Sequence, residues 1–388
     1  MNGRRRNSVC RILLGAILAI ASSAARFSFA EEAAAQPPAP VDAMPIMRLE
    51  AGGPTSFVSA VAFNPQGSTL YAGGWDKVVR AWSWDAESRQ FVLDPAGTYR
   101  VPIGPAMEGV INAVAVSPDG MWLATAGRGM VRGASDLRHP GWKVPAAGTM
   151  TAAMRQDQGT IYLFNTRTRD VRLLRGHTAP VVALAFAPAL DGKPPILISA
   201  GQEWDDKARR FAGAVRAWDA PRGSYLGGVS LPNVTTRPSI AAWHSGTAPN
   251  QLRVAIAWGD ASGALRIWNV ETNRVSTSAD GQYNNTAAWW AEGNRVVTGS
   301  TGRLKLWNVA GAGDSATVQR QLSLASREVP RAIALFASAE GGRVDRAAVL
   351  VKPGDADSTV RMKVVDLANF RLLPGADVAL WDGAGVLP

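Results

Sequence analysis

A chain of 388 residues with 47% hydrophobic and 19% charged residues has enough apolar side chains to bury a large core, which excludes a wholly disordered protein. Its formal net charge of +10 suggests nucleic-acid binding, but five arginines and no acidic residue lie in the first thirty positions. Beyond them, 36 basic residues stand against 31 acidic ones, and this net charge of +5 is typical of a solvated surface. No nucleic-acid partner is therefore predicted.

Residues 1–30 have the three parts of a secretory signal peptide: a basic start at 4–6, an apolar stretch at 12–21 and a small-residue cleavage site at 28–30. Cleavage after Ala25 and a retained membrane anchor stay open as alternatives. The apolar stretch is shorter than the roughly 20 residues that a spanning helix needs. We therefore expect an exported protein, periplasmic or extracellular, with no stable membrane span after cleavage.

Cys10 is the only cysteine and lies inside this predicted signal. The mature chain would then have no disulfide, no thiolate zinc site and no cysteine nucleophile. Residues 31–44 are rich in alanine and proline without periodicity, which predicts a flexible linker. The remaining residues, 45–388, are expected to form one domain.

Within this domain an apolar strand is followed six times by a strand of small residues and then by a strand that ends in an aromatic or apolar residue plus a polar one. The apolar strands are predicted at 58–63, 111–116, 181–186, 240–243, 286–290 and 332–336. The units end at Trp82-Ser83, Phe164-Asn165, Trp218-Asp219, Trp268-Asn269, Trp307-Asn308 and, in a degenerate form, Val365-Asp366. Recurrence at this scale is typical of a circular array of β-sheets.

The predicted fold is therefore all-β, a single β-propeller of four-stranded antiparallel blades. Continuous hydrophobicity in the first strand of each unit indicates that neighbouring sheets cover both of its faces. Six blades are favoured. Seven stay open, because residues 377–382 resemble one strand of a further blade and residues 46–49 could supply an outer strand to the last sheet.

The third unit contains Gly176-His177, Ser199 in its second strand, Asp205 or Asp206 in the following turn, and Trp218-Asp219. This set resembles the WD40-repeat family, here a divergent, exported, bacterial-type member, and the resemblance extends over residues 46–373. It implies a structural network of histidine, serine or threonine, aspartate and tryptophan inside a blade. The residues that it assigns to this network are Asp76, Trp82, His177, Ser199, Asp205, Trp218, Asp260, Trp268 and Trp307.

Two long insertions, residues 129–158 and 202–212, both fall between the second and third strands of their units. In propellers of this type such loops emerge on one face together with the links between blades, so we expect a loop-rich binding face. Arginine and tryptophan, which anchor protein interfaces, occur in or beside both insertions. The alternative for residues 129–158 is a solvated loop without a partner. The alternative for residues 202–212 is a loop whose charged side chains pair with one another. The candidate partner-binding residues are Trp75, Arg132, Arg138, His139, Trp142, Lys143, Trp204, Arg209, Arg210 and Trp258.

Three of these candidates, Trp75, Trp204 and Trp258, precede the turn aspartate of their units. Outward-pointing rings would form an arc of flat apolar surfaces suited to a partner. Packing between blades is the alternative and the commoner role of such rings.

The three histidines are scattered, and neither a zinc-protease, a serine-hydrolase nor a phosphate-loop motif is present. We therefore predict no enzyme, no metal and no cofactor. The predicted function is a non-catalytic scaffold that binds another protein through the loop-rich face. An extracytoplasmic propeller that binds or hydrolyses a glycan or small molecule in its channel is the alternative.

Overall fold

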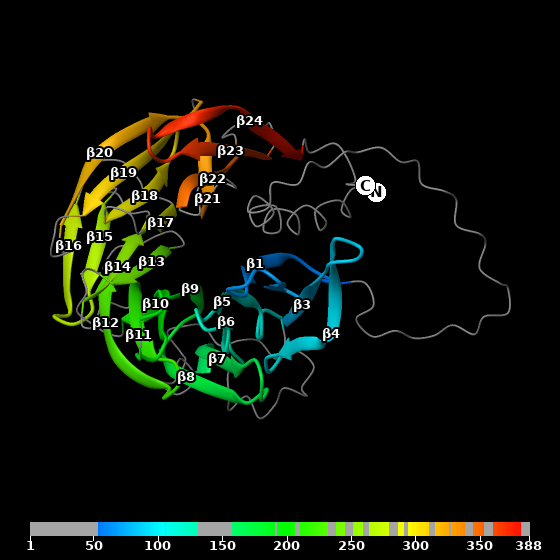
Figure 1. Cartoon of the computed structure of the whole chain (residues 1–388). Helices are drawn as coiled ribbons and strands as arrows, with labels where there is room; N and C mark the ends of the chain where they lie inside the picture. Colours follow the sequence, from blue (N-terminus) through cyan, green and yellow to red (C-terminus); the bar gives the residue numbers. More distant parts are fainter. Residues whose placement is uncertain are drawn as a thin grey trace, which may run out of the picture.

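The structure is a computed structural model, and it describes residues 53–104, 106–130, 157–190, 192–205, 210–231, 238–244, 251–258, 264–278, 286–290, 294–309, 315–325, 327–337, 344–352 and 360–381. Within these residues the chain forms six four-stranded antiparallel sheets, each a blade of a six-bladed β-propeller (Figure 1). The predicted signal peptide (1–30), the linker (31–44) and residues 46–49 lie outside the described residues. No helix in the described part of the chain is long and apolar enough to cross a membrane.

The strands of the first three blades are β1 (Val58–Phe63), β2 (Thr69–Gly74), β3 (Val78–Asp85), β4 (Gln90–Arg100), β5 (Ile111–Val116), β6 (Trp122–Gly127), β7 (Gly159–Asn165), β8 (Val171–His177), β9 (Val181–Phe186), β10 (Ile196–Asp205), β11 (Arg210–Asp219) and β12 (Ser224–Leu231). Those of the last three are β13 (Ser239–His244), β14 (Leu252–Ala257), β15 (Leu265–Asn269), β16 (Arg274–Ser278), β17 (Thr286–Trp290), β18 (Arg295–Ser300), β19 (Arg303–Val309), β20 (Ala316–Ser323), β21 (Val329–Ala337), β22 (Val344–Lys352), β23 (Val360–Asp366) and β24 (Arg371–Trp381). In every blade the four strands lie side by side in chain order.

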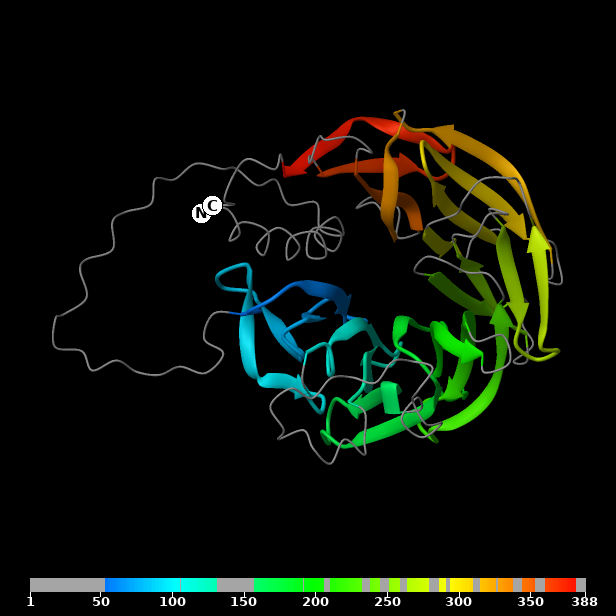
Figure 2. The same cartoon turned by 180° about the vertical axis from the view of Figure 1, so that it is seen from behind.

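The first strand of each blade lies nearest the centre of the propeller. These inner strands contact their neighbours in sequence, β1 with β5, β5 with β9, β9 with β13, β13 with β17 and β17 with β21. Seen from behind, the same succession runs around the centre (Figure 2). Each of the inner strands β5, β9, β13 and β17 therefore has a sheet on either side, which is why its sequence is apolar without alternation.

Short turns join the first and second strands of the first two blades. The Gly67 N–H donates to Asn64 O at 3.0 Å, and the Gly120 N–H donates to Ser117 O at 2.8 Å. Gly120 has a φ of 72°, a left-handed conformation that costs little only at glycine.

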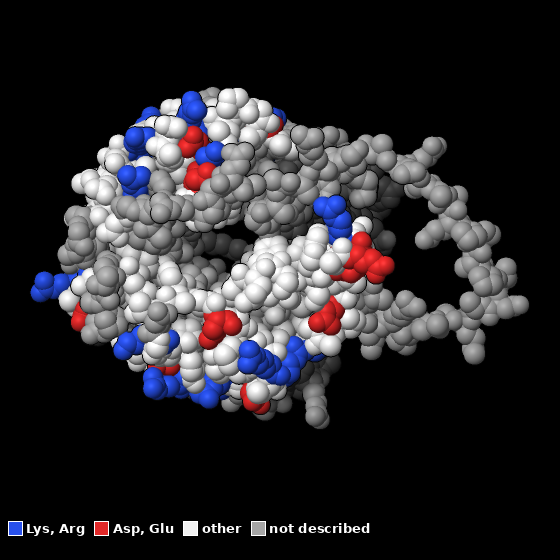
Figure 3. Space-filling view, in the orientation of Figure 1, with Lys and Arg blue, Asp and Glu red and all other residues white. Residues whose placement is uncertain are grey.

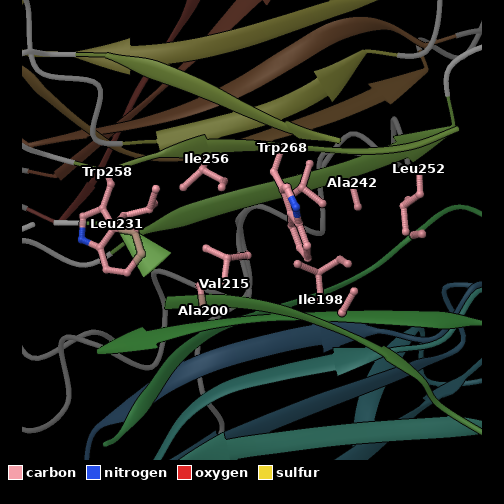
Figure 4. Packing of buried hydrophobic residues seen from close by; sticks show 12 residues of the cluster. Ile198, Ala200, Val215, Leu231, Ala242, Leu252, Ile256, Trp258 and Trp268 are labelled. Carbon is pink, nitrogen blue, oxygen red and sulfur yellow. The ribbon is translucent and has the colours of Figure 1, made fainter. Parts of the chain in front are cut away.

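The core consists of layers between neighbouring blades. One cluster joins the third and fourth blades, where Ile198 and Val215 pack against Ile256 and Trp268 (Figure 4). Equivalent clusters join the first blade to the second, the second to the third, the fourth to the fifth and the fifth to the sixth. The aromatic residue of the third strand fills these layers, since Trp218, Trp268 and Trp307 are all buried.

The seven-blade alternative is corrected by the pairing of β24. Residues 377–381, which resemble a strand of a seventh blade, belong to β24 and pair with β23 as the outer strand of the sixth blade. A register shift between Lys363 and Val365 places the residues around Gly375 in a bulge. The bulge interrupts the strand pattern, so that one long irregular strand reads as two separate ones.

Candidate functional site

The turns between second and third strands and the links between blades meet on one face of the propeller, which we call the loop face. The Trp75 N–H donates to Phe57 O at 2.8 Å, and the Arg128 N–H donates to Val110 O at 2.9 Å. In the third blade the Trp204 N–H donates to Thr178 Oγ1 at 3.2 Å. Each bond joins the end of a second strand to the segment that enters the same blade.

The described ends of the first insertion lie together at the loop face. The Gly129 N–H donates to Gln158 O at 2.8 Å, so the two ends of the insertion are held side by side. Residues 131–156 lie outside the described residues. The candidates among them are Arg132, Arg138, His139, Trp142 and Lys143, and their assignment stays a prediction.

The second insertion is mostly a β-hairpin, which corrects the expectation of a loop over residues 202–212. Strands β10 and β11 stay paired out to Asp205 opposite Arg210, and only residues 206–209, with Arg209, lie outside the described residues. Cross-strand pairing satisfies the backbone N–H and C=O groups that a loop would expose, and it does so regardless of the charged side chains. The hairpin extends the third blade at the loop face.

The three tryptophans beside the turns differ in burial. Trp75 and Trp204 are half-buried, and the Trp75 ring makes an edge-to-face contact with Phe57 at a centroid distance of 5.4 Å. Trp258 is 0% exposed and belongs to the cluster between the third and fourth blades (Figure 4). Its ring is not available to a partner, because Leu231 and the neighbouring sheet cover it. This corrects the inclusion of Trp258 in an exposed arc.

A hydrogen-bonded group of buried side chains lies inside the third blade. His177 Nε2 is 2.8 Å from Ser199 Oγ, and the Trp218 indole N–H donates to the same oxygen at 2.8 Å. An indole N–H only donates, so Ser199 Oγ accepts from Trp218 and has its own hydrogen and a second lone pair left for the contact with the imidazole. Burial, followed by the positive charge of Arg216, lowers the pKa of His177 from 6.5 to about 3, so this imidazole is neutral at physiological pH.

The fifth blade repeats half of this arrangement, because the Trp307 indole N–H donates to Thr298 Oγ1 at 2.8 Å. In the fourth blade the Trp268 indole N–H donates instead to Asn273 Oδ1 at 3.1 Å. Trp82 of the first blade is half-buried. Asp260 and the side chain of Asp205 lie outside the described residues.

Acidic side chains near the loop face are paired with basic side chains from the third strand. Arg80 forms an ion pair with Asp76, whose carboxylate also accepts from the Thr55 N–H at 3.2 Å. In the third blade the Arg216 Nε–H donates to Glu203 Oε1 at 2.8 Å, and this oxygen is 3.7 Å from His177 Nδ1. These pairs hold the turns and hairpin of the loop face onto the sheets.

The basic members of these pairs form a repeated signal that the sequence analysis missed. In five of the six units a lysine or arginine stands two residues before the aromatic or apolar residue that ends the third strand: Arg80, Arg216, Arg266, Lys305 and Lys363. In the sixth blade Lys363 Nζ is 2.9 Å from Glu328 Oε1. The constant spacing of two residues to the unit ends could have identified these positions. Those unit ends are Trp82, Trp218, Trp268, Trp307 and Val365.

Three acidic side chains of the described residues are paired with basic side chains of third strands. Asp76, Glu203 and Glu328 each face a basic side chain. Among the residues that the structure describes, no group of three histidine, cysteine, aspartate or glutamate side chains is placed to hold a metal ion. On the face seen in Figure 3, basic and acidic residues are interspersed around the hollow centre, without a surface of one sign.

Six four-stranded sheets with their strands in chain order define a β-propeller, and its third and fifth blades each contain an indole–hydroxyl hydrogen bond. Residues 45–83 and 102–132 match the family model described as "WD domain, G-beta repeat". The chain is also 37% identical over 78 residues to the small ribosomal subunit protein RACK1 of Neurospora crassa, a match that covers 20% of this chain and 21% of that relative. Two segments of the chain therefore match WD40 repeats, and the blades around them have the strand order of a β-propeller.

The matched ranges cover β1, β2 and most of β3 in the first blade, and β5 and β6 in the second. The third unit, which carries the fullest set of the family's residues, lies outside them. The hydrogen-bonded network therefore lies in the third blade, whereas the family model matches strands of the first and second blades.

Proposed function

We propose that this protein is an exported, non-catalytic scaffold that binds another protein through its loop face. WD40 propellers generally bind other proteins, which supports the general class. The observation that carries the particular site is the common location of two extensions: the first insertion, rooted at Gly129 and Gln158, and the β10–β11 hairpin. The first insertion belongs to the second blade and the hairpin to the third, so the two extensions come from adjacent blades.

The chemistry at the roots of these extensions suits a docking surface. Half-buried Trp75 and Trp204 offer rings at the same face as the extensions, and aromatic side chains are enriched among the residues that anchor interfaces. The ion pairs of Arg80 with Asp76 and of Arg216 with Glu203 fix the backbone beneath these rings. A rigid support of this kind lowers the entropy that ordering a binding surface would cost.

A pull-down with the full-length protein from an envelope extract tests the loop face. Replacing residues 132–155 by a short glycine–serine turn should abolish recovery of a stoichiometric partner. The Gly129–Gln158 hydrogen bond allows the two ends to be joined without moving β6 or β7. The matched control replaces residues 310–314, which join β19 to β20 at the opposite end of a blade, and should leave recovery unchanged. Equal recovery with both variants would contradict the proposal.

Export is tested separately from binding. N-terminal sequencing of the mature protein should start at Glu31, or at Arg26 if cleavage follows Ala25. A chain that keeps Met1 in every cell fraction would contradict export without affecting the proposed scaffold role.

A further inference from the structure

Within the residues that the structure describes, the first and sixth blades each have one sheet face that no neighbouring blade covers. The two blades lie at the ends of the arc (Figure 1, Figure 2). In β3, Val79 and Ala81 pack toward the second blade. Neighbouring residues of a strand point to opposite faces, so Trp82 and Trp84 face away from the second blade. We call the face that carries Trp82 and Trp84 the first end face.

The first end face is apolar and less covered than the same positions in other blades. Trp84 is 45% exposed, whereas the residues that stand two positions after the unit end in three other blades, Ala220, Val309 and Leu367, are 0–2% exposed. Phe91 pairs with Trp84 across the strands, and their rings meet at a centroid distance of 5.1 Å. Large apolar side chains that gather at one exposed place indicate an interaction site.

The sixth blade has a corresponding face at the other end of the arc. Val365 packs toward the fifth blade, so Met362 and Val364 face away from it. Both are half-buried, and Val378, which pairs with Met362, is 45% exposed. We call the face of Met362, Val364 and Val378 the sixth end face.

The positions of Met362 and Val364 are fully covered in every other blade. They stand three residues and one residue before the unit end. In the first five blades the residues at these two positions are at most 2% exposed: Val79, Ala81, Ile161, Leu163, Val215, Ala217, Leu265, Ile267, Leu304 and Leu306. The first and sixth blades therefore lack the layer that joins every other pair of successive blades.

The missing layer defines the chemistry of what would fill it. Elsewhere a third-strand tryptophan packs against aliphatic side chains of the preceding blade, as Trp268 does against Ile198 and Val215 (Figure 4). The first end face has the tryptophans without the aliphatic side chains, and the sixth end face has the aliphatic side chains without an aromatic one. A β-sheet that is apolar on both faces supplies both.

The residues of this sequence that follow the predicted signal and lie outside the described ends are too few for such a sheet. Residues 31–52 and 382–388 number 22 and 7, together 29, whereas a four-stranded blade needs about 40. Residues 31–44 are also rich in proline, which interrupts the pairing of central strands. The sheet that fits between the end faces is therefore sought in another molecule.

We propose that the two end faces together bind a β-sheet of another protein, which completes the ring as a seventh blade. Aliphatic side chains of that sheet pack on Trp82 and Trp84, and aromatic side chains pack on Met362 and Val364. The Trp84 N–H donates to Ser68 O at 2.8 Å, which places Trp84 beside the β1–β2 turn, at the opposite end of the blade from the loop face. The end faces are thus a second interaction surface that does not depend on the loop face.

Photo-crosslinking of the full-length protein in intact cells tests the proposal. Benzoylphenylalanine, a photoreactive aromatic residue, replaces Trp84 in one variant and Val378 in a second. Leu226, 46% exposed on β12 of the third blade, is replaced in the matched control. All three positions are exposed, so the variants should fold. We expect the first two variants to capture one and the same protein, and the control not to capture it.

A seventh blade supplied by the chain itself is the competitor. A copy of residues 238–278, the fourth blade, attached after residue 388 through a glycine–serine linker, should lower the capture by about tenfold or more, because a tethered copy has a high effective concentration. It should also slow hydrogen exchange in β3 and β23. The same extension with Ile267→Ser and Trp268→Ser in the copy lacks the apolar side chains and should leave capture and exchange unchanged.

Several results would overturn the proposal. They are no capture at either end face, different proteins at the two end faces, the same protein at Leu226, and capture unaffected by the attached blade. Capture of a second copy of this chain would show self-association instead, and an internal cross-link from position 84 to β21–β24 would show that the end blades close on each other. The variant that lacks residues 132–155 should still capture the protein, so failure here and failure of the loop-face proposal are distinguishable.

Discussion

In two blades of this propeller a single hydroxyl group is the acceptor for the buried tryptophan of the third strand. Ser199 accepts from the Trp218 indole and contacts the buried imidazole of His177, and Thr298 accepts from the Trp307 indole. The sequence resemblance grouped His177, Ser199 and Trp218, and the structure brings them together. The resemblance did not reveal that Glu203, two residues before Asp205, faces this imidazole. The reason is that residues 202–212 were predicted to be a loop, whereas the β10–β11 pairing places Glu203 there.

The two hydroxyl groups should differ in their contribution to stability. Ser199→Ala leaves two buried polar groups without their partner and should lower the free energy of unfolding by about 2–4 kcal/mol. Thr298→Val leaves the Trp307 indole N–H without its acceptor and should cost about 1–3 kcal/mol. Denaturant unfolding of both variants measures the difference, and an equal or smaller loss for Ser199→Ala would contradict the arrangement.

His177 should make stability depend on pH. Its folded-state pKa of about 3 is below its ordinary value of 6.5. Between these pH values His177 is therefore protonated in the unfolded chain and neutral in the folded chain. The stabilisation is complete above pH 6.5 and is lost as the pH falls. Between pH 7 and pH 5 the loss should be about 2 kcal/mol.

The His177→Gln variant lacks this titration while keeping every carboxylate. Its free energy of unfolding should therefore fall less steeply over the same pH range than that of the wild type, whatever its value at pH 7. Parallel pH profiles for the two proteins would show that His177 is not the buried neutral group described above.

At the scale of elements, the ends of the second strands determine how the loop face is built. Gly127 ends β6, and a Cβ atom there would lie 1.9 Å from Val110 O. That carbonyl accepts the Arg128 N–H at 2.9 Å, so the link between blades lies directly against the strand end. The apolar inner strands were predictable because their hydrophobicity reflects two covering sheets. The hairpin at residues 202–212 was not, because β-pairing there overrides a charged sequence.

Gly127→Ala should separate the link from the strand and cost about 3 kcal/mol of stability, since a backbone carbonyl cannot move aside as a side chain could. Gly120→Ala is the matched control. At that turn only the left-handed φ opposes a side chain, and the expected cost is about 1 kcal/mol. Thermal unfolding of both variants checks the order, and a Gly127→Ala protein as stable as the control would contradict the close approach.

At the scale of the whole molecule, the blades are stabilised by their neighbours to different degrees. Hydrophobic clusters join successive blades from the first to the sixth, and in the described residues none joins the sixth blade to the first. Figure 1 shows these two blades at the ends of the arc. Accordingly Trp82 is half-buried, whereas its counterparts Trp218, Trp268 and Trp307 are buried.

Hydrogen exchange should follow this gradient. Amides of β1–β4 and β21–β24 are expected to exchange faster than those of β9–β16, because the end blades pack against one neighbour and the middle blades against two. Exchange of the intact protein followed by mass spectrometry of its peptides measures this. Equal protection in all six blades would contradict the expectation.

The sequence alone determined the blade, because strand order, apolar inner strands, small second strands and third-strand aromatics are local patterns that repeat. It also located both extensions at the connection between second and third strands. Only the tertiary structure decided that β24 completes the sixth blade, that Trp258 is buried and Trp75 half-buried, and that Trp84 of the first blade is exposed. These features depend on how neighbouring sheets meet, and contacts between residues distant in the chain leave no periodic signal within either segment.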